Sequence, residues 1–385
     1  MQTMVSMFKS NIRQYGMIIA LVLISLLFQI LSDGTLLKPL NVTNLILQNS
    51  YILILAIGML LVIITGHIDL SVGSVAAFIG ALSGVMMVTY HMPFPVSVIL
   101  CLLVGALVGA WQGFWVAYVR IPSFIVTLAG MLLFRGLTMI VLNGMSLAPY
   151  PKMFQKISSG FIADPLGDSH LLTILIGAVL AIIYILIELR NRKSKLTYQF
   201  EVIPAGLFVA KLAVITIIIL AFAFVLSQYE GIPNILILLS VLVIIYSFVM
   251  NKMVMGRHIY ALGGNEKAAN LSGVKTKRVT FWVFVNMGVL AAMSGLVFAA
   301  RLNAATPKAG TNFELDAIAA CFIGGASASG GVGTVIGAII GGLVMGVMNN
   351  GMSLVGLGID WQQGIKGLVL LLAVAFDIYN KSKSS

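Results

Sequence analysis

Charged residues are scarce in this chain. Of its 385 residues, 60% are hydrophobic and only 9% are charged, and the mean hydropathy is +1.06. A soluble domain is about 25% charged, so this chain cannot cover itself with a polar surface. The composition excludes a soluble enzyme, a nucleic-acid-binding protein and a disordered scaffold. Because a helical span takes roughly 20 residues, we predict an all-α polytopic transmembrane bundle of about 10–12 spans, some of them broken.

Other absences narrow the function. The two cysteines, Cys101 and Cys321, lie far apart in apolar segments, so they indicate neither a disulfide framework nor a metal site. The chain has no Gly-x-x-x-x-Gly-Lys-Ser/Thr motif and hence no nucleotide-binding P-loop of its own. A proton or sodium relay requires several carboxylates within the membrane, and the sequence does not show them. Asp69 is the only acidic residue near the start of a run whose side chain could point into the bundle. We expect no catalytic residue, metal or cofactor, and an energy source in another protein.

The apolar runs give a topology. They fall at 16–32, 45–65, 69–89, 94–119, 123–143, 171–189, 202–227, 233–252, 279–300, 314–326, 332–349 and 362–380. Placing the N-terminus inside puts most of the 23 lysines and arginines in cytoplasmic segments, as the positive-inside rule requires. Both termini are then cytoplasmic, and residues 1–385 form one permease-like domain. It has an outer loop at 144–170 and a cytoplasmic loop at 253–278, and Glu314 and Asp316 are expected outside.

Two polar, glycine-containing segments are candidates for a translocation pathway. Asp69, Ser71, Gly73 and Ser74 stand at the start of the third run, where Asp69 and Ser71 can cap exposed helix amides. The segment is either such a cap or part of a discontinuous helix that lines a pathway, since irregular backbone at membrane depth must face protein or water. A faint echo of residues 71–75 at 331–335 favours the second interpretation, because paired interruptions mark transporter routes, although chance explains it equally simply.

The second candidate segment spans residues 324–333 and holds five glycines. It either lets two helices pack closely or forms a flexible break that acts as a gate. Its candidate pathway residues are Gly324, Gly325, Ser327, Gly330, Gly331 and Gly333.

Arg135 lies about twelve residues into the fifth run, near mid-membrane. A charge at this depth costs on the order of 3 kcal/mol or more. The arginine must therefore find a partner, either helix carbonyl groups or a polar contact in the pathway.

The inner loop contains a short predicted helix within residues 264–273. Asn265 is a suitable N-cap, Glu266 suits the first turn, and Gly273 is a suitable stop. About seven residues are far fewer than the roughly 12–15 that a helix needs alone, so a partner must hold it. The apolar face of this helix is too small for firm binding to anionic lipid, which favours docking to another protein. The docking residues are Gly264, Asn265, Glu266, Ala268, Ala269, Leu271, Ser272 and Gly273.

Four ordered motifs together resemble a known family. They are residues 64–75, residues 122–128 with Arg135 and Gly136, residues 264–273, and residues 322–333. The chain from about residue 40 onward resembles the permease subunits of bacterial monosaccharide ABC importers, which serve ribose, xylose, galactose or arabinose. Extra apolar runs between 170 and 230 are similar to the xylose and multiple-monosaccharide branch. His67 departs from the small residue expected in the first motif.

The resemblance implies a function and a set of partners. It implies a non-enzymatic permease for a pentose or hexose in the bacterial inner membrane, where it contacts lipid and forms a homodimeric pore. Expected partners are an extracytoplasmic sugar-binding protein and a cytoplasmic twin-cassette ATPase, into whose groove residues 264–273 would fit as a coupling helix; nucleic acid is not a partner. The same machinery for a nucleoside or a branched-chain amino acid is an alternative, as is an ion-coupled secondary transporter.

Overall fold

The computed structural model describes residues 12–164, 170–200 and 202–382, which are helical with connecting segments and contain only two isolated β-bridges. This confirms the all-α prediction. The helices are α2 (Ile12–Leu31), α3 (Pro39–Ile64), α4 (Val72–Gly84), η1 (Val85–Thr89), α5 (Phe94–Phe114), η2 (Trp115–Val119), α6 (Ser123–Leu142), α7 (Lys152–Ser159), α8 (Leu171–Thr197), α9 (Ala205–Ser227), α10 (Asn234–Lys252), α11 (Val254–Gly264), α12 (Glu266–Leu271), α13 (Thr276–Leu302), α14 (Phe313–Ile323), α15 (Val335–Leu354) and α16 (Ile359–Ser382).

Nine helical stretches among the described residues are long and apolar enough to cross a membrane. They are α3, α4 with η1, α5 with η2, α6, α8, α9, α10, α13 and α15. Helices α2 and α16 match the first and last apolar runs. Helix α14 has 11 residues, or about 16 Å, which is about half the hydrocarbon thickness of roughly 30 Å. The run at 314–326 is therefore no complete span, and the prediction of broken helices is confirmed.

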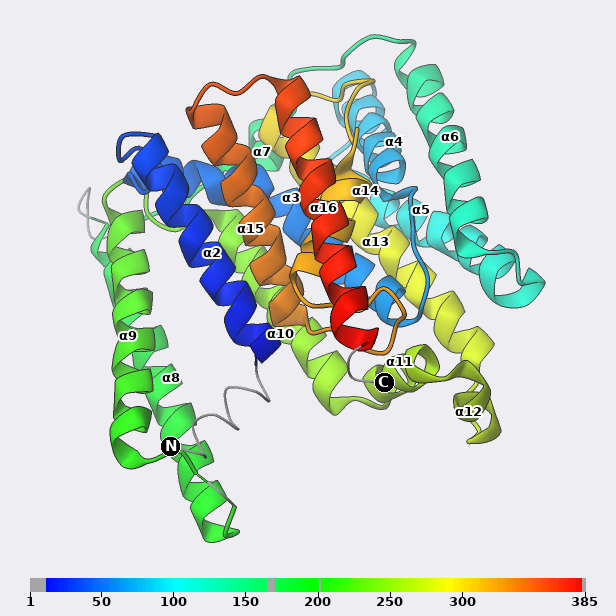
Figure 1. Ribbon diagram of the computed structural model, residues 1–385. Helices are drawn as coiled ribbons and strands as arrows, with labels where there is room; N and C mark the ends of the chain where they lie inside the picture. Colours follow the sequence, from blue (N-terminus) through cyan, green and yellow to red (C-terminus); the bar gives the residue numbers. More distant parts are fainter. Residues whose placement is uncertain (1–11, 165–169, 201, 383–385) are drawn as a thin grey trace.

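Helix α3 forms the centre of the bundle (Figure 1). It packs against α13, α14 and α15, and α13 in turn packs against α4 and α5. The α5–α13 crossing is close because glycines recur every fourth residue on α5, at Gly105, Gly109 and Gly113, and a Cβ on any of them would collide with α13. Small residues let helix backbones approach in a membrane, so this repeat fixes how the two helices cross.

Helices α8 and α9 form a hairpin at the edge of the bundle (Figure 1, green). They occupy the extra apolar runs between 170 and 230, and most of their surface is exposed. The two sides of this insertion come together at a β-bridge between Phe161 and Pro233, where the Ile162 amide donates to the Ile232 carbonyl over 3.0 Å. The hairpin is thus attached to the bundle through two chain segments that lie side by side.

The bundle has two distinct ends. Helix α2 begins and α16 ends at the end that carries α11 and α12 (Figure 1), which we name the α12 end. At the opposite end the predicted outer loop folds onto the bundle. Tyr150 donates a hydrogen bond to the Gly80 carbonyl (2.9 Å), and Leu147 pairs with Ala305. Residues 165–169 of that loop lie outside the described residues.

Candidate functional site: three breaks and a short helix

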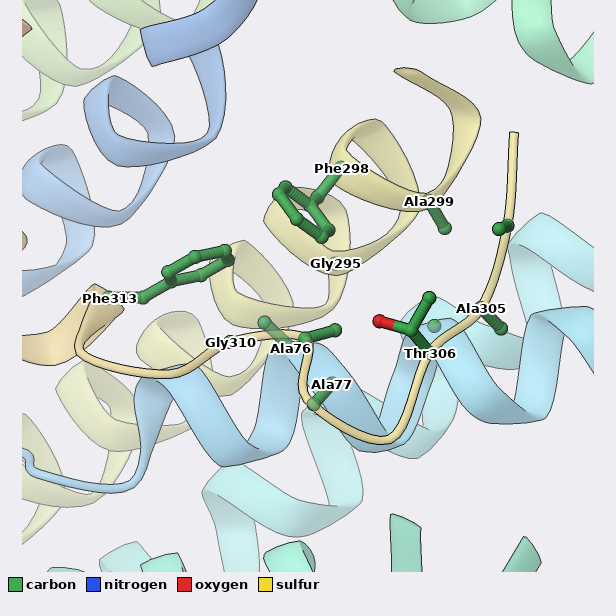
Figure 2. A pocket seen from close by; sticks show the side chains of 12 residues that line it. Ala76, Ala77, Gly295, Phe298, Ala299, Ala305, Thr306, Gly310 and Phe313 are labelled. Atoms are coloured by element: carbon green, nitrogen blue, oxygen red, sulfur yellow. The ribbon is translucent and has the colours of Figure 1, made fainter. Parts of the chain in front are cut away.

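Three non-helical segments interrupt the helices at the centre of the bundle. We name them the first break (residues 65–71, between α3 and α4), the second break (303–312, between α13 and α14) and the third break (324–334, between α14 and α15). Figure 2 shows the second break passing between α4 and α13, with Gly310 beside Ala76. The third break holds the second candidate segment, and the first break holds Asp69 and Ser71 of the first, whereas Gly73 and Ser74 lie in the first turn of α4.

The first break is joined to α5 by a buried chain of hydrogen bonds. Asp69, only 2% exposed, accepts from the Ser71 amide (2.8 Å) and hydroxyl (2.6 Å), and Gln112 donates to the same hydroxyl over 2.6 Å. The Ser71 side chain makes no capping bond to α4. The predicted cap was therefore wrong for Ser71, whereas Asp69 does bind a backbone amide at the start of the helix, that of Ser71 directly before α4. Sequence reasoning missed Gln112, although an amide inside an apolar run was a usable signal.

Helix α4 lies directly against the second break. A Cβ on Gly73 would collide with the Gly310 carbonyl and the Glu314 carboxylate, so glycine is required by space. The neighbouring Ser74 hydroxyl is buried and has no hydrogen-bond partner among the described residues. Arg135 donates from Nη1 to the Ala309 carbonyl over 2.6 Å. Its partner is thus a carbonyl of the second break, and α6 is tied to irregular backbone.

The two carboxylates expected on the outer side of the membrane are buried in the bundle. Glu314 and Asp316 occupy the first turn of α14 and are 8% and 6% exposed. Asp316 pairs with Lys366 of α16 at 3.1 Å, and a helix N-terminus favours negative charge. The expected side of the membrane stays a prediction, and the burial adds to it: the second break leads directly into the start of α14 inside the bundle. With Asp69, three carboxylates are buried, so the impression that buried carboxylates are few was wrong.

The third break is both a site of close packing and a real interruption. A Cβ on Gly324 or on Gly337 would collide with the other residue's carbonyl, so α14 and α15 touch backbone to backbone. Beyond this contact Gly325, Gly330 and Gly331 have positive φ angles of 80°, 80° and 74°, which L side chains rarely adopt. Ser327 donates to Asp377 of α16 over 3.0 Å. The two interpretations left open by the sequence are therefore compatible.

Helix α12 has both predicted caps. The Asn265 side chain accepts from the Ala268 amide (3.0 Å), and Gly273 has a φ angle of +87°. The Val274 amide donates to the Ala269 carbonyl, which completes a Schellman motif. The helix has six residues, and Leu271 is 91% exposed whereas Ala269 is only 5% exposed. Ala269 therefore anchors the helix to its own bundle, and Ala268 and Leu271 face outward.

A tight junction connects α11 and α12 to the breaks. A Cβ on Gly263 of α11 would overlap the carbonyl oxygen of Ile64, the last residue of α3. That same oxygen accepts from the Gly331 amide over 2.8 Å. Tyr260 of α11 donates to the Gly333 carbonyl over 2.7 Å, and burial raises the pKa of its hydroxyl, which keeps the donor protonated. Helix α11 is thus bonded directly to the third break and packed on the start of the first.

His67 adds an electrostatic link between the first break and α12. Burial lowers the pKa of its imidazole, and the nearby Glu266 carboxylate partly offsets this. The ring also packs against Phe284, with ring centroids 5.9 Å apart. The residue that departs from the expected motif therefore lies between α12 and α13.

Comparisons with known proteins identify the family of this chain. Residues 41–374 match the family described as "Branched-chain amino acid transport system / permease component". The chain belongs to this permease family. It is 41% identical to the xylose transport system permease protein XylH of Haemophilus influenzae, over 97% of this chain and 98% of that protein. XylH of Escherichia coli is 39% identical, over 97% of this chain and 94% of its own.

A ribose permease is also similar. The ribose import permease protein RbsC of Escherichia coli is 34% identical, over 88% of this chain and 85% of that protein. No solved structure gives a significant match. The resemblance to monosaccharide permeases is thereby confirmed, and this is a multi-pass membrane protein of a transport system.

Proposed function

We propose that this chain is the permease subunit of an ATP-driven importer of a pentose, with xylose the first candidate. The observation that carries the proposal is the identity of 41% and 39% to two xylose permeases over nearly the whole chain. The ribose permease at 34% identity supports a pentose in general. The solutes to test against a pentose are hexoses, nucleosides and the branched-chain amino acids of the family description.

Helix α12 is the proposed docking site for a separate ATPase subunit. Helix α12 has six residues where roughly 12–15 are needed for a helix alone, so the bundle itself must hold it. Its caps and the buried Ala269 fix it on the bundle, and they leave Ala268 and the fully projecting Leu271 for a partner. The positive-inside rule places this end in the cytoplasm, because Arg257, Lys275, Lys277 and Arg278 flank the helix. The sugar-binding protein would then dock at the opposite end.

The junction supports a route for coupling. A displacement of α12 by the ATPase would pass through Gly263 and Tyr260 of α11 to the Ile64 carbonyl and the third break. The proposed pathway residues of the first and third breaks lie beside these contacts. In a homodimer, as the family resemblance implies, the two copies would each contribute one set of breaks. ATP hydrolysis itself belongs to the ATPase.

The docking role is tested by Leu271→Asp, with Leu196→Asp as the matched control. Both leucines are exposed, but Leu196 lies at the end of α8. We expect Leu271→Asp to abolish co-purification of the ATPase and ATP-driven xylose uptake in proteoliposomes, whereas the control leaves both intact. Ala268→Arg should act like Leu271→Asp. Full ATPase association in both α12 variants would refute the docking site.

The solute and the energy source need a separate experiment. Proteoliposomes that contain the chain, its ATPase and its binding protein are assayed with labelled xylose, ribose, uridine and leucine. We expect ATP-dependent uptake of xylose before the others. An ion-coupled transporter would instead give uptake by the chain alone under a proton or sodium gradient.

A further inference from the structure

A cavity of about 310 Å³ lies among α3, α13, α14, α15 and α16. We name it the chamber. Gln48, Asn49, Tyr51, Asn349, Gln363 and Lys366 are among its lining residues. Its volume falls within the range of small-molecule sites, which is about 300–1,000 Å³.

The chamber reaches deep into the bundle from the end opposite α12. Asn49 lies ten residues from the start of α3, and Lys366 lies seven residues from the start of α16. At 1.5 Å per residue these positions are about 15 Å and 10 Å below the helix ends. This is up to half of a hydrocarbon core of roughly 30 Å. Thr311 and Asn312 of the second break also line the chamber, so its inner wall is irregular backbone.

The lining is rich in uncharged hydrogen-bonding groups. Side-chain amides project from α3, α15 and α16, and each amide both donates and accepts. The Oδ1 atom of Asn349 is buried and accepts no hydrogen bond from the described residues. An unpaired buried acceptor is costly, and a ligand that donates to it removes this cost. The chamber therefore favours a ligand that carries several hydroxyl groups.

One ion pair and one aromatic pair of the chamber fit the same ligand class. Lys366 is neutralised by Asp316, with an Nζ–Oδ1 distance of 3.1 Å. Tyr51 stacks on Phe313 with ring centroids 4.1 Å apart, which provides an apolar surface for the C–H face of a sugar ring. Arg301 is the cation that a negatively charged sugar acid would use instead.

We propose that the chamber binds the transported solute itself, as a neutral polyhydroxyl molecule, after the binding protein releases it and before it passes the second break. This inference rests on the proposed function, because it names a site for the sugar within each permease copy. Selection of the sugar then takes place twice, once in the binding protein and once here.

Direct binding tests the chamber without any other subunit. Purified full-length chain in lipid nanodiscs is titrated with labelled D-xylose and, in parallel, with labelled D-xylonate. We expect saturable xylose binding that is about tenfold weaker in Asn349→Leu and in Gln363→Leu, as the loss of one hydrogen bond predicts. Asn191→Leu, the same substitution on the exposed end of α8, is the matched control and should bind as wild type.

Three outcomes would overturn the proposal. They are no saturable xylose binding, the same affinity in wild type and both chamber variants, and tighter binding of xylonate than of xylose. Variants are compared only when they elute from size-exclusion chromatography as wild type does. Asn349→Ala, which removes the amide without adding bulk, replaces Asn349→Leu if the leucine variant does not fold.

A second readout separates failure of the chamber from failure of the proposed function. In the reconstituted complex, we expect Asn349→Leu to lower xylose uptake about tenfold while ATP hydrolysis stimulated by the binding protein persists, so that more ATP is consumed per sugar. Unchanged uptake in this variant refutes the chamber alone. Absence of ATP-driven xylose uptake in wild type refutes the proposed function.

Discussion

The α8–α9 hairpin and the central helices differ in a way that hydropathy does not reveal. Helices α9 and α8 are the most apolar of the nine span candidates, yet only 11% and 17% of their most apolar windows are buried. Helix α15 is the least apolar of the nine and is 72% buried, and α3 is 83% buried. Lipid is as apolar as leucine, so apolarity marks a span without marking the interior.

Small and polar residues mark the interior instead. The α5–α13 crossing depends on glycines, and α3 is joined to α15 by a reciprocal amide pair between Asn41 and Asn350, at 2.8 and 3.1 Å. The lipid-facing side of the hairpin needs neither feature, because no helix packs against it there. The same kind of substitution should therefore lower stability more in the central helices than in the hairpin.

The largest difference in stability between the two regions is expected for substitutions of glycine. Gly288→Leu on α13 would drive a side chain into the backbone of Gly105 and Gly109, whereas Gly206→Leu on α9 meets nothing within 4 Å. We expect the first to lower stability by about 3 kcal/mol or more, since overpacking against backbone cannot relax, and the second to have no effect. Unfolding in detergent measures both. Equal stability of the two variants would break the comparison.

Ion pairs provide the next test. Asp316→Ala leaves Lys366 without its partner inside the bundle, which we expect to cost about 3 kcal/mol. Glu188→Ala breaks the pair with Lys211 in the hairpin, but Lys211 lies six residues from the start of α9, so its long side chain can extend to the membrane interface and the loss should be smaller, about 1 kcal/mol. Thermal unfolding in the same detergent compares them. The double variant Asp316→Ala/Lys366→Ala should recover part of the loss, and the absence of any recovery would argue against the charge as the cause.

A single methyl group gives a smaller effect. Ile57→Val on α3 removes a fully buried methyl, which typically costs about 1 kcal/mol. Ile218→Val on α9 is the matched change at a 60% exposed position and should leave the unfolding midpoint unchanged. A larger loss at Ile218 than at Ile57 would mean that the exposed face of α9 contacts another protein.

Removal of the whole hairpin should have the smallest effect on the core. The chain before it and the chain after it are already hydrogen-bonded at Phe161 and Pro233. Residues 164–231 can therefore be replaced by a Gly-Gly link with little rearrangement of the remaining backbone, because closing a short loop costs little conformational entropy. We expect a folded chain that still binds the ATPase, measured by co-purification. Loss of folding in this deletion would show that the hairpin supports the core.

The sequence sufficed for features that depend on near neighbours. The apolar runs located the helices, and Asn265 and Gly273 correctly marked the two caps of α12. It failed where the partner lies far along the chain. The burial of Asp316 was missed because its partner, Lys366, is fifty residues away, and Gln112 was missed because its partner, Ser71, is forty-one residues away.

The orientation of a short helix was also beyond the sequence. Ala268 and Ala269 are chemically identical, yet one is exposed and the other is buried on the bundle. Which side of α12 faces inward is decided by how α11 and α13 pack, and this depends on the whole fold.

The Ile64 carbonyl oxygen is a contact point shared by α3, α11 and the third break. It belongs to the most deeply embedded helix, and two chain segments, at Gly263 and Gly331, rest against it from different sides. Because there is no room for a larger residue at Gly263, we expect a displacement of α12 to turn α11 about this contact and not to slide it along α3. The third break, hydrogen-bonded to the same oxygen, would then turn with it.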